Sequence, residues 1–330
     1  MPQITRRYYL KLAALGTAAI AFRPLLAHAS DAVTKVDVNA QNAWALNQSS
    51  NFHAVYDDAQ TKEAFYPFLC NVFHLFPERE FQQLITSVTA AKQTDQAIYT
   101  SVQKHLKKIT PYLANLRYSL PALRRQKHEM MDETLKLLQP QTKVNGYLEV
   151  GTTGRYLSAL HSELIITGDK ILLHSQHPTY GIADIMERGQ VTIPARFVDM
   201  RNYAPISPTD IPDASLDLVT NFIGFHHSPS ENLDGFVRSL HRVLRSGGRM
   251  VVRDHEVDSP AMNRRVALAH DVFNMGLHAD WGINQSEIRH FTSLAQLRSY
   301  LEARGFESVP GELYQSGDPT HNALMLFIKT

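Results

Sequence analysis

Apolar residues in the first half of the chain recur at the spacing of amphipathic helices. Four such helices are predicted, and the fourth runs from about Ala122 to Gln139, where Pro140 ends it. Residues 30–50 are small and polar without a clear period, so we expect an extended linker there. The pattern predicts an all-helical domain over residues 30–143. The first three helices rest on apolar positions three and four apart: Phe65, Leu69, Val72, Phe73 and Phe76; Phe81, Leu84, Ile85 and Val88; Ile98, Val102, Leu106 and Ile109.

From Val144 onward the pattern changes to short apolar runs separated by helical stretches. This alternation is typical of an α/β sheet with crossover helices. Strands are predicted at 146–150, 170–176, 196–198, 215–223 and 249–254. We therefore assign residues 144–330 to an α/β domain. Between its strands and its end, an amphipathic helix is predicted over 263–281, lying over the cleft.

Residues 1–29 have the layout of an export signal. Arg6 and Arg7 are followed by an aromatic residue, a leucine and a lysine, then by an apolar run from 12 to 22 and by Ala27-His28-Ala29. The run is too short to span a bilayer, which needs about 20 apolar residues. The segment resembles a twin-arginine signal, which implies the twin-arginine export machinery as a partner and a periplasmic location. The alternative is an ordinary secretion signal or an anchor, against which the weakly hydrophobic, alanine-rich run and Arg23 argue.

Composition narrows the function classes. Lys and Arg number 33 against 32 Asp and Glu, so no overall field attracts nucleic acid, and we expect no nucleic-acid partner. A single cysteine excludes an intrachain disulfide and a cysteine-based zinc finger. Seven basic residues and no acid lie between Gln96 and His128. This stretch, Lys104 to Lys127, could contact an anionic membrane surface; the alternative is a solvated helix face.

Two motifs in the α/β half carry the candidate chemistry. The first, at 146–157, is a strand, a turn rich in Gly and Thr, and the start of a helix, where glycines let a ligand approach the backbone. The second is an Asp-Leu-Val strand that ends in His226-His227 and is followed, about 20 residues later, by Arg-Val-Leu-Arg-Ser-Gly-Gly and another strand. Together they resemble a class I S-adenosylmethionine-dependent methyltransferase of the small-molecule group, over about Val144 to Thr330. The resemblance implies a Rossmann-like sheet with an antiparallel closing hairpin, preceded here by the all-helical domain.

The resemblance also implies where S-adenosylmethionine would bind. Glu149 to Gly154 would form the loop under its methionine part, Asp199 would lie near the adenine amino group, and Phe222 would lie beside the sulfonium. The candidate cofactor residues are therefore Glu149, Gly151, Thr152, Thr153, Gly154, Ser175, Asp199 and Phe222.

Two departures from the family pattern stand out. The usual acid-x-Gly-x-Gly-x-Gly keeps only Gly151 and Gly154, with Thr153 or a one-residue deletion between them. The second strand lacks the acid that accepts both ribose hydroxyls, because Ser175 and Gln176 stand there and offer single, uncharged hydrogen bonds.

Methyl transfer to an oxygen needs an aligned acceptor and a base for its proton. His226 and His227 end one predicted strand, and Asp254 and His255 end the next, so both pairs should meet at one edge of the sheet. We expect His227 or His255 to be the base, with Asp254 orienting it; the alternative is that one histidine of each pair only packs or bonds a backbone carbonyl. These four residues are the candidate catalytic set.

The same cluster raises the question of a metal. His270, His278, Asp280, His290 and His321 follow it and could add ligands. The histidines are scattered, and no zinc-helix motif surrounds them, so the sequence predicts no metal site.

Two functions remain. The first is a methyltransferase that acts on a small-molecule or lipid-like substrate. The second is an exported ligand-binding protein that keeps the fold without methyl transfer, because one fold hosts many functions. The departures in the cofactor loop favour the second, and the rim histidines favour the first.

Overall fold

The computed structural model describes residues 50–112 and 114–330, so the predicted export signal lies outside the described residues. In that part of the chain one seven-stranded sheet has the order β3-β2-β1-β4-β5-β7-β6. All neighbouring strands from β3 to β5 are parallel, and β7 is antiparallel to both β5 and β6. This confirms the predicted Rossmann-like class I sheet with its closing hairpin. The strands are β1 (Lys143–Val150), β2 (Ile165–His174), β3 (Arg196–Asp199), β4 (Leu216–Asn221), β5 (Leu244–His255), β6 (Phe306–Tyr314) and β7 (Asn322–Lys329).

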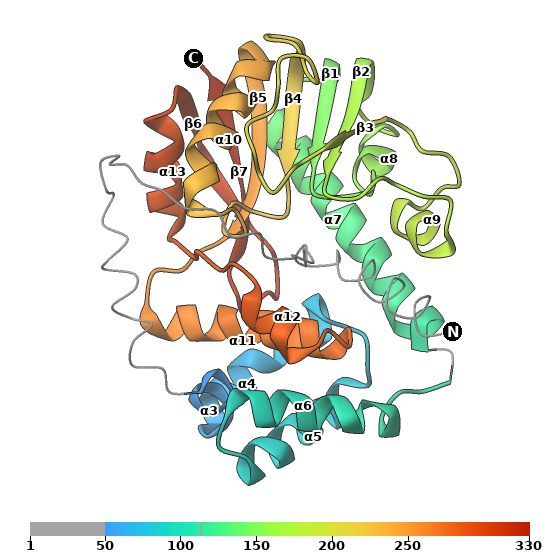
Figure 1. The fold of residues 1–330 in the computed structure, drawn as a ribbon, viewed down its shortest axis with the longest axis vertical. Helices are drawn as coiled ribbons and strands as arrows, with labels where there is room; N and C mark the ends of the chain where they lie inside the picture. The colour runs from blue at the N-terminus through green and yellow to red at the C-terminus, as the bar shows by residue number, and fades with distance from the viewer. Residues whose placement is uncertain (1–49, 113) are drawn as a thin grey trace.

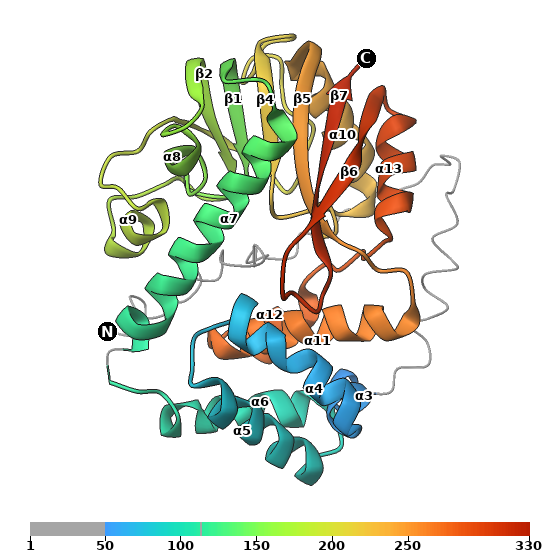
Figure 2. The ribbon, with the colours of Figure 1, turned by 180° about the vertical axis from the view of Figure 1, so that it is seen from behind.

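Both faces of the sheet are buried under helices (Figures 1 and 2). Alternate residues of β1 point to opposite faces. Leu148 packs in the core formed with α10 (Ser230–Val243) and α13 (Leu294–Glu302). Tyr147 packs in the core formed with α7 (Leu120–Leu138) and α8 (Leu157–Leu160). Burial on both sides explains why the strands are nearly continuous apolar runs.

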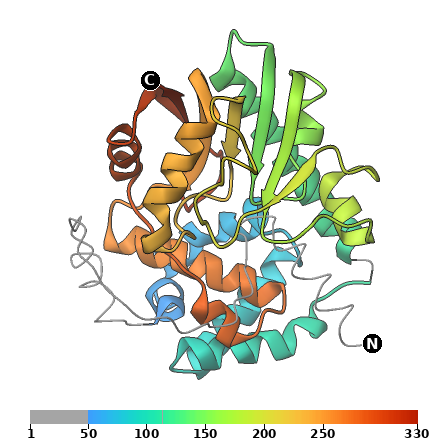
Figure 3. The ribbon, with the colours of Figure 1, turned by 45° about the horizontal axis from the view of Figure 1, so that its top comes forward.

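A layer of helices lies across the carboxyl ends of the parallel strands (Figures 1 and 3). Their shared core includes Phe73 and Phe273, whose rings lie 5.1 Å apart in an edge-to-face contact. The layer thus joins segments that are about 200 residues apart in the sequence, and it covers the edge where the candidate site residues end their strands. Its helices are α3 (Asn51–Tyr56), α4 (Ala59–Pro67), α5 (Glu78–Ala91), α6 (Asp95–His105), α11 (Pro260–Gly276) and α12 (Trp281–Ser286).

The helical half follows its predicted pattern with local differences. The first predicted helix is divided into α4 and a π-helical turn, Phe68–Val72, which follows Pro67. The third ends as α6 and continues in a 3₁₀ turn, Leu106–Lys108. A second π-helical segment, Asn115–Ser119, leads into α7. Along the chain, helix α9 (Ile182–Arg188) follows β2 and precedes β3.

The packing of α7 and α11 bears on the domain boundary predicted between residues 143 and 144. Although α7 precedes that boundary, Met130 and Leu138 pack with the sheet. Although α11 follows it, Leu268 and Val272 pack with the N-terminal helices. The boundary between residues 143 and 144 stays a prediction. In the structure, α7 from the N-terminal half packs on the sheet, and α11 from the C-terminal half packs in the helical layer.

Among the described helices, no single one combines the length and the apolar character needed to cross a bilayer.

Candidate functional site

The loop after β1 lies at the point where the order of the sheet reverses, between β1 and β4. In open α/β sheets, ligands bind at this switch point, beyond the carboxyl ends of the strands. Gly151 has a φ of +83°, and a Cβ there would lie 2.2 Å from the Cδ1 atom of Ile223. Only glycine therefore fits, both for its backbone conformation and for the close approach of the loop after β4.

Glu149 organises this loop from below. Its carboxylate is buried and accepts hydrogen bonds from the backbone N–H groups of Tyr156 (3.1 Å) and Leu157 (2.6 Å) and from the Thr152 hydroxyl. The Tyr147 hydroxyl donates to the same carboxylate at 3.2 Å. Burial raises the pKa of Glu149, although the hydrogen bonds from Thr152 and the two amides act in the opposite direction. With both oxygens engaged inside the loop, Glu149 holds the start of α8 in place.

Two buried oxygens on either side of the switch point have no hydrogen-bond partner among residues 50–112 and 114–330. They are the Thr153 hydroxyl in the loop after β1 and the Asn221 side-chain carbonyl at the end of β4. Thr153 is 3% exposed and Asn221 is fully buried. Since buried polar atoms without partners are costly, these two are the natural contacts for a polar ligand in this place.

The other predicted cofactor residues lie around the same edge. Phe222 is buried and its ring meets that of Tyr156 at 4.6 Å, edge to face. Ser175 follows β2 and is half-buried. Asp199 is exposed at the end of β3 and accepts a hydrogen bond from the backbone N–H of Arg201 at 2.9 Å. The sheet thus places all of the predicted cofactor residues on its carboxyl edge, with Gly154 at a φ of +98° in the loop itself.

His226 and Asp254 form a buried pair beside this edge. Nδ1 of His226 lies 2.6 Å from Oδ1 of Asp254, and the Asp254 carboxylate also accepts from the backbone N–H groups of Phe225 and His255, both at 2.9 Å. Burial alone would raise the pKa of Asp254, but the adjacent His226 and these N–H groups hold it well below its usual value. The side chain is therefore an aspartate, and it orients the His226 ring.

Gly224 makes room for this pair. Its φ is +78°, and a Cβ there would lie 2.6 Å from Nδ1 of His226 and 2.9 Å from Oδ2 of Asp254. The turn after β4 therefore brings its backbone against the pair as only a glycine can.

Four histidine rings gather at this place. The ring of His226 lies 4.2 Å from that of His227, 5.3 Å from that of His255 and 5.4 Å from that of His270. All four side chains are at least nine-tenths buried. Burial lowers the pKa of His227 to about 3 and that of His255 to about 4, with His226 adding to both effects, and burial also lowers the pKa of His270. These three imidazoles are therefore neutral at neutral pH.

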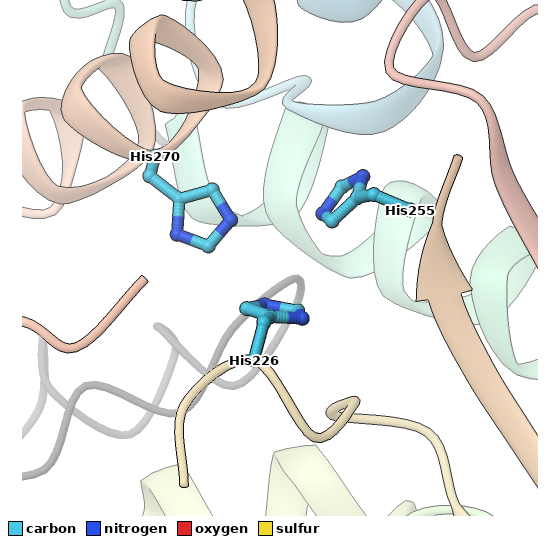
Figure 4. A group of neighbouring side chains, drawn as sticks. All are labelled: His226, His255 and His270. Atoms are coloured by element: carbon cyan, nitrogen blue, oxygen red, sulfur yellow. The ribbon is translucent and has the colours of Figure 1, made fainter. Parts of the chain in front are cut away.

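Figure 4 shows His226, His255 and His270 around one common space. The first comes from the loop after β4, the second from the end of β5, and the third from α11 in the helical layer. In the part of the chain that the structure describes, Nε2 of His226 and both ring nitrogens of His270 have no hydrogen-bond partner.

The partners of the rim histidines differ from those expected. Asp254 orients His226, whereas Nδ1 of His227 faces the carbonyl of Ile288 at 3.0 Å and Nδ1 of His255 faces that of Thr320 at 3.1 Å. The expected orientation of His227 or His255 by Asp254 is therefore wrong. The reason is local: the turn at Gly224 brings the His226 ring, and not that of His227, onto the carboxylate.

Two further residues of the histidine cluster, His270 and Glu287, have no assigned role in the prediction from the sequence. His270 was one of five downstream candidates, and Glu287, whose Oε2 lies 3.5 Å from Nδ1 of His270, was not considered. The signal available in the sequence is the position of His270, which lies four residues after Val266 and three before Phe273, on the buried side of α11. Among the other candidates, His290 contacts Ser230 at 3.2 Å, and His321 is exposed.

Comparison with protein families identifies the chain. The model of a family described as a methyltransferase domain matches residues 122–310, more than half of the 330 residues. The chain therefore belongs to this methyltransferase-domain family. No curated protein matches it.

Several solved structures are similar to the chain at low identity. A 1,6-didemethyltoxoflavin-N1-methyltransferase of Burkholderia thailandensis, solved with 1,6-didemethyltoxoflavin and S-adenosylhomocysteine, is 16% identical with a TM-score of 0.41, over 63% of this chain and 79% of that one. An O-methyltransferase family 2 protein of Planctomyces limnophilus in complex with apigenin is 15% identical with a TM-score of 0.43, over 76% and 66%. The [4+2]-cyclase SpnF is 15% identical with a TM-score of 0.42, over 62% and 82%.

Proposed function

We propose that this chain is an S-adenosylmethionine-dependent methyltransferase that acts on a small-molecule or lipid-like substrate. The observation that carries the proposal is the placement of a glycine-containing switch-point loop and a buried His–Asp pair on the same edge of a methyltransferase-family sheet. Family membership alone leaves the activity open, because one fold hosts many functions.

The residues present fit the cofactor in part. The unpartnered oxygens of Thr153 and Asn221 offer acceptors for its ammonium group, and Phe222 offers an apolar wall. Asp199 offers a carboxylate to the adenine amino group from the end of β3. At the ribose position, Ser175 can make only a single uncharged hydrogen bond, so we expect weaker binding than a carboxylate would give.

The bound cofactor would supply an electrophilic methyl group. The chain's own contribution is to hold the acceptor in line and to take its proton. With Nδ1 of His226 donating to Asp254, Nε2 carries the free lone pair, and it is buried with no partner among the described residues. We therefore transfer the role of base from His227 or His255 to His226.

A specific observation favours the alternative of a ligand-binding protein without methyl transfer. The Ile223 side chain packs directly against Gly151, where the methionine part of the cofactor would approach the loop. In that case Ile223 would exclude the cofactor, and the same edge would bind another ligand.

Titration calorimetry of residues 30–330 with S-adenosylmethionine and S-adenosylhomocysteine separates the two functions. Thr153→Val should weaken binding about tenfold without lowering stability, because it removes a hydroxyl that makes no hydrogen bond within the described structure. Thr89→Val is the matched control, since Thr89 also has a buried, unpartnered hydroxyl, on α5. No heat with either ligand, together with binding gained in Ile223→Ala, would establish the alternative.

We also propose that residues 1–29 direct the folded chain to the periplasm through the twin-arginine pathway. Fusion of residues 1–35 to a reporter should export it, and changing Arg6 and Arg7 to lysines should block export. Continued export of the lysine variant would contradict this pathway.

We also propose that the basic stretch contacts an anionic membrane surface. Lys104, Lys107, Lys108, Arg117, Arg124 and Arg125 are exposed. Lys127 instead donates to the carbonyl of Arg188 at 2.6 Å and does not take part. Binding to anionic vesicles that disappears at high salt would support the contact.

A further inference from the structure

We propose that His226, His255 and His270 bind one divalent transition-metal ion, and that Zn²⁺ is the ion that fits them. The inference does not rest on the proposed function, because metal binding is measured directly. If the ion is bound, Nε2 of His226 is a ligand and cannot also be the base, so the two uses of this atom exclude each other.

The three side chains already stand close to a coordination geometry. One ring nitrogen from each lies within 4.8 Å of the other two. Zn–N bonds of about 2.0–2.1 Å in a tetrahedral site place nitrogens about 3.3 Å apart. The rings therefore need to approach by about 1.5 Å at most, which small side-chain rotations supply.

The outer contacts of the three rings match those of metal-bound histidines. Such histidines turn their second nitrogen to a carboxylate or a carbonyl, which fixes the ring and its tautomer. Nδ1 of His226 faces Asp254 at 2.6 Å, and Nδ1 of His255 faces the carbonyl of Thr320 at 3.1 Å. Nδ1 of His270 faces Glu287 at 3.5 Å. In His226 and His255, Nε2 is therefore the nitrogen left for an ion, whereas both nitrogens of His270 lack a hydrogen-bond partner among the described residues.

The space between the rings is otherwise unexplained. The His226 and His270 nitrogens that face it are buried and have no partner in the described structure. Phe291 closes one side, with its ring 5.0 Å from that of His270 and 5.3 Å from that of His226. An ion bound by all three rings would give these nitrogens the partner that the described residues do not offer.

A second group of side chains competes for the same ion. His227, His270 and Glu287 also have ligand atoms within 4.8 Å of one another. Oε2 of Glu287, however, already accepts from Arg289 at 2.9 Å and from the Asn274 amide at 3.0 Å, while Oε1 has no partner among the described residues. The guanidinium would repel a dication there, so charge favours the three-histidine group.

The experiment measures metal in residues 30–330 produced without a polyhistidine tag. Elemental analysis after growth with zinc should find about one Zn²⁺ per chain. After removal by a chelator, titration with Zn²⁺ should restore one equivalent. Co²⁺ should then give the visible absorption of a low-coordinate nitrogen site. A chain that takes up no Zn²⁺ or Co²⁺ above the level of a histidine-depleted control would overturn the proposal and leave the methyltransferase function standing.

Two variants distinguish the two groups, since His255 belongs only to the first and His227 only to the second. His255→Ala should lower Zn²⁺ affinity by about a hundredfold or more, given that loss of a mere outer partner costs about 10- to 100-fold. His227→Ala should leave affinity within about threefold, and His161→Ala, an exposed histidine after α8, serves as the surface control.

Folding is checked in the same samples. Thermal melts in chelator should give the same midpoint for the wild type and His255→Gln, and added Zn²⁺ should raise only the wild-type midpoint. Equal stabilisation of both proteins, or loss of affinity in His227→Ala with retention in His255→Ala, would overturn the assignment.

Discussion

Nδ1 of His226 and Oδ1 of Asp254, which lie 28 residues apart, meet at 2.6 Å in a fully buried contact between the loop after β4 and the end of β5. The same carboxylate accepts from two backbone amides, those of Phe225 and His255. Asp254 thus ties the turn after β4 to the adjacent strand.

Replacing Asp254 with alanine should therefore destabilise the fold strongly. The change leaves three buried donors without an acceptor, and each buried group left unsatisfied costs about 1–3 kcal/mol. Urea unfolding followed by circular dichroism measures the loss. Asp254→Asn keeps one acceptor oxygen and should lose less than half as much; equal losses would show that charge alone, and not acceptor number, holds the turn.

Glu149→Gln tests the carboxylate under the cofactor loop. Four donors converge on its two oxygens, so an amide group would face at least one of them with its own N–H. We expect a loss of about 2–3 kcal/mol in the free energy of unfolding and a loop more accessible to hydrogen exchange at Tyr156 and Leu157. Unchanged exchange at these two amides would contradict the role assigned to Glu149.

Local patterns were sufficient to predict most of the fold. Helices buried on one face and strands buried on two faces have characteristic patterns of apolar residues, and these patterns can be read directly from the sequence. Helix α13 was not predicted, although Ser293 and Gln296 form a capping box at its start, because its apolar stretch is short. The π-helical turn at Phe68–Val72 also has no distinct sequence signal.

The sequence predicts at which edge of the sheet the site lies, but it does not predict which side chains pair there. Parallel strands bring their carboxyl ends together, so His226, His227 and Asp254 had to be neighbours. Which ring reaches the carboxylate depends on the backbone turn at Gly224, and that direction is a three-dimensional property. His270 joins them only because α11 packs with the N-terminal helices, through contacts such as that of Phe73 with Phe273.

Gly151 and Ile223 should show strong energetic coupling. Gly151→Ala places a methyl group against the Ile223 side chain and also forces alanine into a left-handed conformation, which costs about 1–2 kcal/mol by itself. We expect a total loss of about 3 kcal/mol or more in the wild-type background. In an Ile223→Ala background the steric part disappears, so the same change should cost only about 1–2 kcal/mol. Urea midpoints of the four proteins in this double-mutant cycle give the coupling, and strict additivity would contradict the contact.

Glu133 gives the fold a defined dependence on pH. This half-buried side chain lies on α7, and burial raises its pKa from 4.5 to about 7, although Arg253 acts in the opposite direction. Because the folded-state pKa lies above the unfolded one, the folded state favours the protonated acid. That contribution to stability is complete below about pH 4.5 and is lost as the pH rises through 7.

Glu133→Gln should therefore be as stable as the wild type at pH 4.5 and more stable at pH 8. Solvent screening at this half-exposed position reduces the difference at pH 8 to on the order of 1 kcal/mol. Urea midpoints at both pH values measure it, and Glu163→Gln, at an exposed carboxylate before β2, serves as the control. A gain at pH 4.5 that equals the gain at pH 8 would show that the substitution acts through packing and not through the proton on Glu133.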